Sequence, residues 1–213
     1  MFAGKNLWDI IQIGGFTMYI LIFTSILSIA VIIERYIYLS IRGRIKRTKI
    51  IPKLAEAILA GKYDTAKSIC ETTKSTLSSV ALAGITYSGH DEKIVSNAMS
   101  REVAVETVKL EKNTAILGTI GNIAVYIGLF GTVLGIIRAF HDISVIGSGG
   151  MNIVIGGVSE ALICTATGLL VAIPASIFYN YFSRKIDTMV TEMELCSSEI
   201  LDLITTQNKR TGK

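Results

Sequence analysis

The chain has 213 residues, of which 50% are hydrophobic and only 18% are charged, and its net charge at pH 7 is +4. A soluble domain usually carries about a quarter charged residues, so this composition argues against a soluble globular protein. Two prolines and no long polar tract argue against disorder, and three widely spaced cysteines argue against a disulfide scaffold or a zinc knuckle.

Three stretches lack charged residues over a length that crosses a membrane. Ile10–Ile33 and Asn113–Ile137 contain none, and residues 143–183 contain only Glu160. A helix needs about 20 apolar residues to cross the hydrocarbon core, and only helices or closed barrels can cross it. The alternating pattern of a barrel is absent. The sequence therefore predicts an all-α integral membrane protein with transmembrane helices at residues 10–34, 113–140 and 151–182, the first of them retained and not cleaved as a signal peptide.

Lysine and arginine are distributed unevenly around these helices. Only Lys5 precedes the first helix, a basic cluster occupies residues 35–53, residues 139–183 contain no Lys or Arg, and Arg184 and Lys185 follow. The positive-inside rule then predicts a periplasmic N-terminus at residues 1–9, a periplasmic loop at 141–150, and cytoplasmic segments at 35–112 and 183–213. The basic cluster follows a membrane helix directly, which favours membrane lipids over nucleic acid as its partner.

The segments outside the membrane are predicted to be helical. Apolar spacing indicates short helices at Ile50–Ala60, ended by Gly61, and at Asp64–Cys70 and Leu77–Tyr87. Asp91 is placed to cap a helix from Glu92, and with no breaker before Phe140 we expect one continuous helix, about 70 Å long, that forms a stalk. A C-terminal helix at Arg184–Leu203 is expected to pack against it, within a cytoplasmic helical domain.

Sequence motifs of enzymes are missing. The chain has no phosphate-binding P-loop, no His-Glu-x-x-His and no Gly-x-Ser-x-Gly, and the glycine-rich residues 147–150 lack the context of a phosphate site. Packing is the default role for Cys70, Cys164 and Cys196. We therefore expect no enzymatic activity, no cofactor and no metal site.

Small residues form a stripe on each of the last two membrane helices. Such stripes let helices approach closely in lipid, where packing replaces the hydrophobic drive. The threonines on these stripes, Thr132 and Thr165, also carry hydroxyls that donate and accept hydrogen bonds, so a narrow polar path is the alternative to close packing alone. The stripes comprise Thr114, Gly118, Gly121, Val125, Gly128, Thr132, Gly135 and Ala139, and then Ala161, Thr165, Gly168, Ala172 and Ala175.

Glu160 is the one charged residue within the third apolar stretch. It lies about 13 Å along the helix from Met151, inside the hydrocarbon. A charge at that depth costs roughly 3 kcal/mol and by default indicates an ion or proton route. A protonated glutamate bonded to a neighbouring helix is the structural alternative, and the residues alone leave both open.

Motifs in the last two membrane helices resemble those of the MotA/TolQ/ExbB proton-channel family. They are Gly-Leu-Phe-Gly-Thr-Val at 128–133, Ser-Glu-Ala-Leu at 159–162, Thr-Gly-Leu at 167–169, Ala-Ile-Pro-Ala at 172–175 and Tyr-Asn at 179–180. The resemblance is strong over residues 100–185. Three predicted spans favour the ExbB/TolQ branch. Val125, Leu134 and Gly156 depart from common family residues and blur the choice between ExbB and TolQ.

The resemblance implies a bacterial inner-membrane energy transducer. It implies a homopentameric ring, an ExbD/TolR-like single-span dimer in the central pore that carries the proton-binding aspartate, and a TonB/TolA-like protein that uses the motion for outer-membrane transport or envelope maintenance. Thr132 and Thr165 match the pore threonines and Glu160 the membrane glutamate. The resemblance assigns helix packing and pore geometry to Gly128, Gly131, Gly135, Gly168 and Pro174.

Two further hypotheses compete with the channel subunit. A structural scaffold would hold partner helices without conducting protons, and would need Glu160 for assembly alone. A membrane enzyme is disfavoured, because the sequence offers no plausible pair of nucleophile and base.

Overall fold

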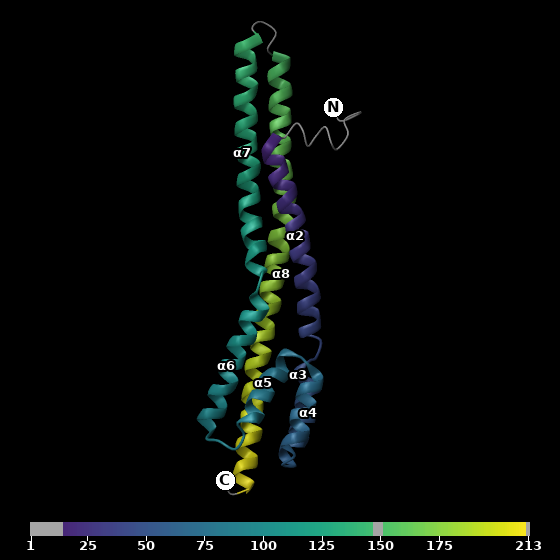
Figure 1. Cartoon of the computed structure of the whole chain (residues 1–213), viewed down its shortest axis with the longest axis vertical. Coiled ribbons are helices and arrows are strands. Elements are labelled where there is room, and N and C mark those ends of the chain that lie inside the picture. The colour runs from purple at the N-terminus through teal and green to yellow at the C-terminus, as the bar shows by residue number, and fades with distance from the viewer. Residues whose placement is uncertain (1–14, 147–150, 212–213) are drawn as a thin grey trace. The chain divides into compact units, whose positions relative to one another are not determined.

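The computed structural model describes residues 15–146 and 151–211, all of whose regular elements are helices (Figure 1). The predicted all-α fold is confirmed, and three of the helical stretches are long and apolar enough to cross a membrane. Residues 1–14, which include the predicted N-terminal segment, lie outside the described residues. The helices are α2 (Gly15–Arg42), α3 (Arg47–Leu59), α4 (Tyr63–Thr73), α5 (Thr76–Thr86), α6 (Glu92–Glu111), α7 (Thr114–Ile146) and α8 (Met151–Thr211).

These helices are divided between two compact units. The first, here called the apolar unit, contains α2 up to Glu34, together with 113–181, so it holds α7 and the first half of α8. The second, here called the charged unit, contains 35–112 and the chain after 181. Helix α8 belongs to both.

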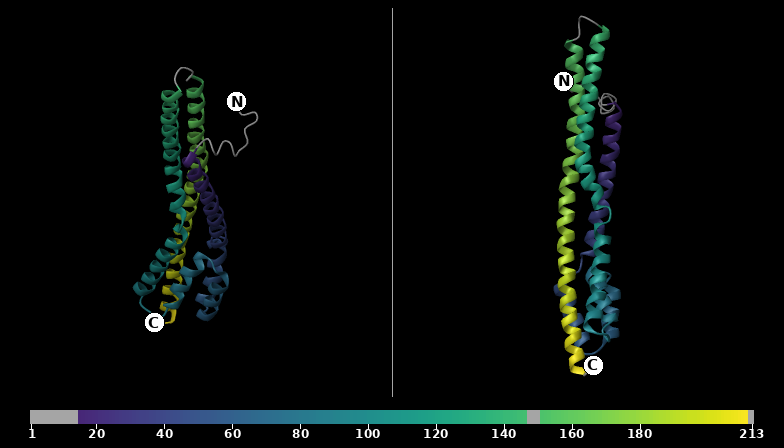
Figure 2. Two further views of the ribbon diagram at one scale, coloured as in Figure 1. Left: turned by 45° about the horizontal axis from the view of Figure 1, so that its top comes forward. Right: turned by 90° about the vertical axis from the view of Figure 1, so that its left-hand side faces the viewer.

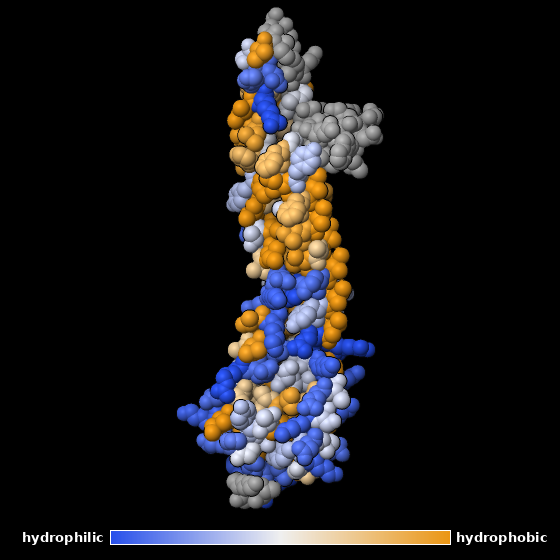
Figure 3. Space-filling view, viewed as in Figure 1, coloured by the Kyte–Doolittle hydropathy of each residue, from blue (hydrophilic) through white to orange (hydrophobic). Residues whose placement is uncertain are grey.

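In the apolar unit the three helices run side by side (Figures 1 and 2). Small and aliphatic side chains fill the space between them, among them Leu21, Ala124 and Ala175. Large apolar side chains such as Phe23, Phe130 and Leu170 are instead exposed. Figure 3 shows the resulting hydrophobic face of this unit. A helical unit that is apolar on its outside is suited to lipid.

In the charged unit, α5 packs against both α6 and α8. A Cβ atom added to Gly84 would lie 3.1 Å from Met99 Cγ and 3.2 Å from Ile200 Cγ2, so both neighbours approach the α5 backbone closely. Ser75 caps α5: its hydroxyl accepts the Ser78 N–H, and the Ser78 hydroxyl accepts the Ser75 N–H in return. Such a capping box stabilises a helix start by about 1 kcal/mol.

The C-terminal helix predicted at Arg184–Leu203 is confirmed as the end of α8. Cys196 lies on the buried face of this helix, whereas the neighbouring Leu195 is 43% exposed. The neighbour of this face is α5, because the Cys196 thiol contacts the Leu77 carbonyl at 3.9 Å. The face consists of Phe182, Ile186, Met189, Met193, Cys196, Ile200 and Ile204.

The predicted continuous helix from Glu92 to Phe140 is wrong. Helix α6 ends at Glu111, Lys112 is extended with ψ 135°, and Asn113 has a left-handed φ of 63° before α7 begins. Asparagine tolerates this conformation better than most residues, because its short polar side chain bonds locally. Asp91 does hold the N-cap position of α6, but its side chain makes no capping hydrogen bond.

Helix α7 also ends later than predicted. It continues through Ile146, because no glycine or proline interrupts 141–146. The rest of the expected loop, residues 147–150, lies outside the described residues.

A buried carboxylate joins α2 and α6 within the charged unit. Glu106 is only 1% exposed and pairs with Arg42 at the end of α2, while its other oxygen accepts from Lys109 Nζ at 2.7 Å. This hydrogen bond raises the pKa of Lys109. Arg35 Nη1 donates to the Leu110 carbonyl at 3.3 Å nearby. The end of α2 is thus fixed to α6 by charge-assisted bonds.

Candidate functional site

Helices α7 and α8 meet backbone to backbone at two glycines. A Cβ atom on Gly128 would lie 2.8 Å from the Cys164 carbonyl oxygen and 3.2 Å from Gly168 Cα. A Cβ atom on Gly168 would lie 2.6 Å from the Ala124 carbonyl oxygen. Real Cβ atoms do not approach backbone so closely, so only glycine permits this contact. The predicted small stripes therefore do face each other, as in other close helix pairs in membranes.

The close contact continues toward the end of α7. A Cβ atom on Gly131 would lie 2.9 Å from Cys164 Cβ, and one on Gly135 would lie 2.6 Å from Ala161 Cβ. We call this line of contact between α7 and α8 the glycine seam, comprising Gly128, Gly131, Gly135, Cys164 and Gly168. It contains the four glycines that the family resemblance assigned to helix packing and pore geometry.

Thr132 and Thr165 meet across the glycine seam, and their hydroxyl oxygens are hydrogen-bonded to each other. The Thr132 hydroxyl also lies 3.2 Å from the Gly128 carbonyl oxygen and 3.3 Å from that of Ala161. The Thr165 hydroxyl lies 3.2 Å from the same Gly128 oxygen. Both side chains are half-buried.

The two hydroxyls have fewer hydrogens than contacts. Each threonine carries one O–H donor, whereas its oxygen accepts up to two hydrogen bonds. Four contacts therefore compete for two hydrogens, and each hydrogen has a choice of acceptors. The pair is a polar cluster within an otherwise apolar unit, able to donate to or accept from a further group.

Glu160 lies in α8 just before the seam, but its side chain lies outside the described part of the structure. The next residue, Ala161, is buried against Gly135, and its carbonyl accepts from Thr132. The helical turn that carries Glu160 is thus fixed against α7.

Pro174 lies inside α8 without ending it. Its ring removes one N–H donor, so the Leu170 carbonyl loses its helical partner. The side chain faces outward, whereas Ala172 and Ala175 beside it are buried.

One contributor to the site was not found from the sequence. Thr17, in α2, is 3% exposed, and its hydroxyl lies 3.7 Å from the thiol of Cys164. A Cβ atom on Gly131 would lie 2.7 Å from the same hydroxyl. Helix α2 therefore completes the packing at the seam. One threonine among many gives no signal in the sequence, because its neighbours come from distant segments.

The fold and the seam define a class: an all-helical membrane protein with a hydroxyl pair between two closely packed helices. A family model described as the MotA/TolQ/ExbB proton channel family matches residues 64–195. The chain belongs to this family.

The similar proteins include some named ExbB and others named TolQ, and the chain therefore belongs to the ExbB/TolQ branch of the family. It is 36% identical over 117 residues to the biopolymer transport protein ExbB of Xanthomonas campestris pv. campestris, covering 55% of this chain and 46% of the relative. It is 41% identical over 96 residues to the Tol-Pal system protein TolQ of Pseudomonas aeruginosa, covering 45% and 42%. The matches thus span less than half the length of these relatives.

Proposed function

We propose that this protein is the proton-channel subunit of an inner-membrane energy-transducing complex. It works with an ExbD/TolR-like single-span partner and drives a TonB/TolA-like protein that serves outer-membrane transport or envelope maintenance. One observation carries the proposal: Thr132 and Thr165 form a hydroxyl pair across the glycine seam. Family membership supports it.

The hydroxyl pair acts on a carboxyl group supplied by the partner. Because each hydroxyl can either donate or accept, Thr132 and Thr165 hydrogen-bond to a partner aspartate in its ionised form as donors and in its protonated form as acceptors. They thereby orient the aspartate and lower the cost of its charge in an apolar surrounding. Glu160 contributes to the proton path or to assembly. Each proton that crosses gains about 2.3 kcal/mol per 100 mV of membrane potential.

The proposed topology places the N-terminus in the periplasm and residues 35–112 and 183–213 in the cytoplasm. The distribution of Lys and Arg supports this topology. Basic residues follow the first and third apolar stretches, at 35–53 and at Arg184 and Lys185, and the positive-inside rule assigns such flanks to the cytoplasm. The proposed assembly is a homopentameric ring around the partner dimer, which rests on the family resemblance.

Proton flux into vesicles tests the proposal. The chain is reconstituted with the ExbD/TolR-like subunit of its own organism, and flux is followed with a pH-sensitive dye under an imposed potential. We expect Thr132→Val and Thr165→Val each to reduce flux severalfold while the complex still assembles. The matched control is Thr167→Val in the same helix. Among the described residues, the Thr167 hydroxyl bonds only the Ile163 carbonyl, one turn earlier, at 2.8 Å. Unchanged flux in both seam variants would refute the proposed role.

A structural scaffold is the second candidate, favoured by the backbone contact at Gly128 and Gly168. It predicts that Glu160→Gln lowers the yield of complex and leaves the activity per assembled complex unchanged. Measuring yield and flux on the same preparations separates the two functions.

A further inference from the structure

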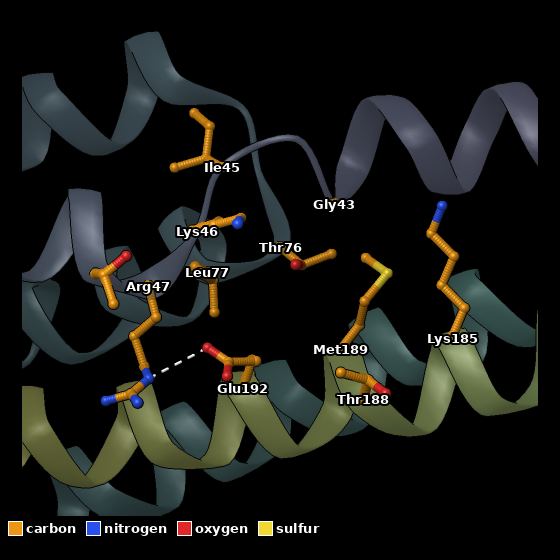
Figure 4. A pocket seen from close by; sticks show the side chains of 11 residues that line it. Gly43, Ile45, Lys46, Arg47, Thr76, Leu77, Lys185, Thr188, Met189 and Glu192 are labelled. Atoms are coloured by element: carbon orange, nitrogen blue, oxygen red, sulfur yellow. Dashed lines mark hydrogen bonds and ion pairs between the residues drawn. The ribbon is translucent and has the colours of Figure 1, made fainter.

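A pocket of about 410 Å³ lies within the charged unit, where three segments distant in sequence converge. The turn after α2 and the start of α3 contribute one wall, the first residues of α5 a second, and α8 the third (Figure 4). Its lining consists of Gly43, Ile45, Lys46, Arg47, Thr48, Thr76, Leu77, Lys185, Thr188, Met189 and Glu192.

The charge of this lining is positive. Lys46, Arg47 and Lys185 contribute cations, and Glu192 is the single acid. The Glu192 carboxylate accepts from Arg47 Nε at 3.2 Å, and Arg47 also pairs with Glu199, so the Arg47 charge is already paired with two carboxylates. Within the described residues Lys46 and Lys185 form no salt bridge, although the Lys185 ammonium lies 6.0 Å from the centre of the Tyr36 ring. Two cations thus remain for a bound anion.

The rest of the lining divides into hydroxyls and apolar side chains. Thr48 and Thr76 carry hydroxyls that can donate to anionic oxygens, whereas the Thr188 hydroxyl donates to the Arg184 carbonyl at 2.9 Å. Leu77 and Met189 form an apolar part of the wall. In Figure 4 the Lys46 and Lys185 side chains lie on different sides of the space above Met189. Cations, hydroxyls and an apolar floor together match a phosphate group attached to an apolar body.

The pocket also lies where two apolar helical segments end. Helix α2 is apolar up to Glu34 and ends at Arg42, immediately before Gly43 at the pocket. In α8 the apolar run ends at Ser183, immediately before Arg184 and Lys185. The ends of transmembrane helices lie at the level of the lipid headgroups, and basic pockets on the cytoplasmic side bind anionic headgroups.

We propose that this pocket binds the phosphate headgroup of an anionic phospholipid from the cytoplasmic leaflet. Lys46 and Lys185 pair with the phosphate. The hydroxyls of Thr48 and Thr76 donate to its oxygens, and the apolar wall contacts the glycerol and the start of the acyl chains. The inference rests on the membrane placement in the proposed function, and adds a specific lipid site to the basic cluster.

Native mass spectrometry of the full-length protein tests the site. The protein in detergent is titrated with phosphatidylglycerol and, separately, with phosphatidylcholine, and bound lipid is counted by mass. We expect tighter binding of phosphatidylglycerol. In the double variant Lys46→Gln/Lys185→Gln, we expect the affinity of the protein for phosphatidylglycerol to fall by about fivefold for each charge removed. The matched control is Lys49→Gln/Lys53→Gln, which removes the same charge from exposed positions outside the pocket and retains most of the binding.

Three results would overturn the proposal. The first is equal affinity for the two lipids. The second is an equal loss of phosphatidylglycerol affinity in the two double variants. The third is binding of inorganic phosphate as tight as that of phosphatidylglycerol, which would indicate a site for soluble phosphate. The variant Lys46→Arg/Lys185→Arg keeps the charge and is expected to restore binding, which separates the site from a folding defect. Lipid binding is read by mass and not by flux, so its failure is distinguishable from failure of the proposed channel function.

Discussion

The Thr132 hydroxyl of α7 and the Thr165 hydroxyl of α8 are hydrogen-bonded across a seam that has no room for a Cβ atom at Gly128. The pair therefore depends on the glycines, because any added side chain would force the two helices apart. It also couples the two threonines to one shared acceptor, the Gly128 carbonyl oxygen.

Proton flux in the double variant Thr132→Val/Thr165→Val tests this coupling. Because the two hydroxyls act as one cluster, we expect the loss in the double variant to be clearly smaller than the product of the two single losses. The measurement is the flux assay in vesicles, applied to the two single variants and the double variant. Two independent losses that multiply would mean that the hydroxyls act separately.

Glycine-to-alanine substitutions in α8 test the seam itself. Gly168→Ala places a Cβ atom 2.6 Å from the Ala124 carbonyl oxygen, so we expect a loss of about 1–3 kcal/mol of stability from overpacking. Gly156→Ala is the control in the same helix, because a Cβ atom there meets nothing within 4 Å. Thermal unfolding in detergent, followed by circular dichroism, gives the comparison. Equal melting temperatures for the two variants would show that the seam has room for a methyl group.

Glu106→Gln tests the buried carboxylate of the charged unit. Glu106 is 1% exposed and serves two cations, so removing its charge leaves Arg42 and Lys109 without their partner. Both cations are partly exposed to solvent, which reduces the cost to about 2 kcal/mol. Glu111→Gln, an exposed change at the end of the same helix, is expected to have little effect. Thermal unfolding of the two variants measures the difference, and indistinguishable melting would argue against the ionic cluster.

Alkylation of Cys196 tests the burial of the α5–α8 contact. Desolvation by burial, together with the smaller effect of the Glu199 carboxylate, raises the pKa of this thiol from 9.0 to about 12. Such a shift leaves roughly a thousandfold less thiolate near pH 8 than an ordinary cysteine has, and thiolate is the reactive form. We expect native Cys196 to react slowly with iodoacetamide, and a cysteine introduced by Ser198→Cys, at an exposed position nearby, to react fast. Comparable rates would contradict the burial.

The same shift makes stability fall with pH. The folded-state pKa of Cys196 lies above the unfolded value, so its contribution is fully present below about pH 9 and is lost as the pH rises toward about 12. The melting temperature of the protein is expected to fall over this range, with a shallower slope in Cys196→Ala. If the melting temperature of Cys196→Ala fell with pH as steeply as that of the unmodified protein, the loss of stability at alkaline pH would come from other groups.

The apolar helices and the small-residue stripes were largely predictable from the sequence. Uncharged stretches and small residues at helical spacing are properties of single segments, so Gly128, Gly135 and Gly168 could be placed on such stripes before the structure was known. That Thr132 meets Thr165 depends instead on how α7 packs against α8.

Contacts between distant segments were not predictable. The pairing of Arg42 with Glu106 and the position of Thr17 beside Cys164 depend on how helices pack, which no single segment encodes. The break at Asn113 was missed for a different reason. Asparagine is only a weak helix breaker, and nothing in its sequence neighbourhood signals the left-handed conformation that it adopts.

The surplus of acceptors over hydrogens at Thr132 and Thr165 has one more consequence. Each hydroxyl can rotate its O–H bond from one acceptor to another, and the bond between the two threonines can exchange its donor, so the local dipole reorients while the heavy atoms stay in place. The seam can therefore be rigid in its backbone and still respond electrically to whatever charge lies beside it.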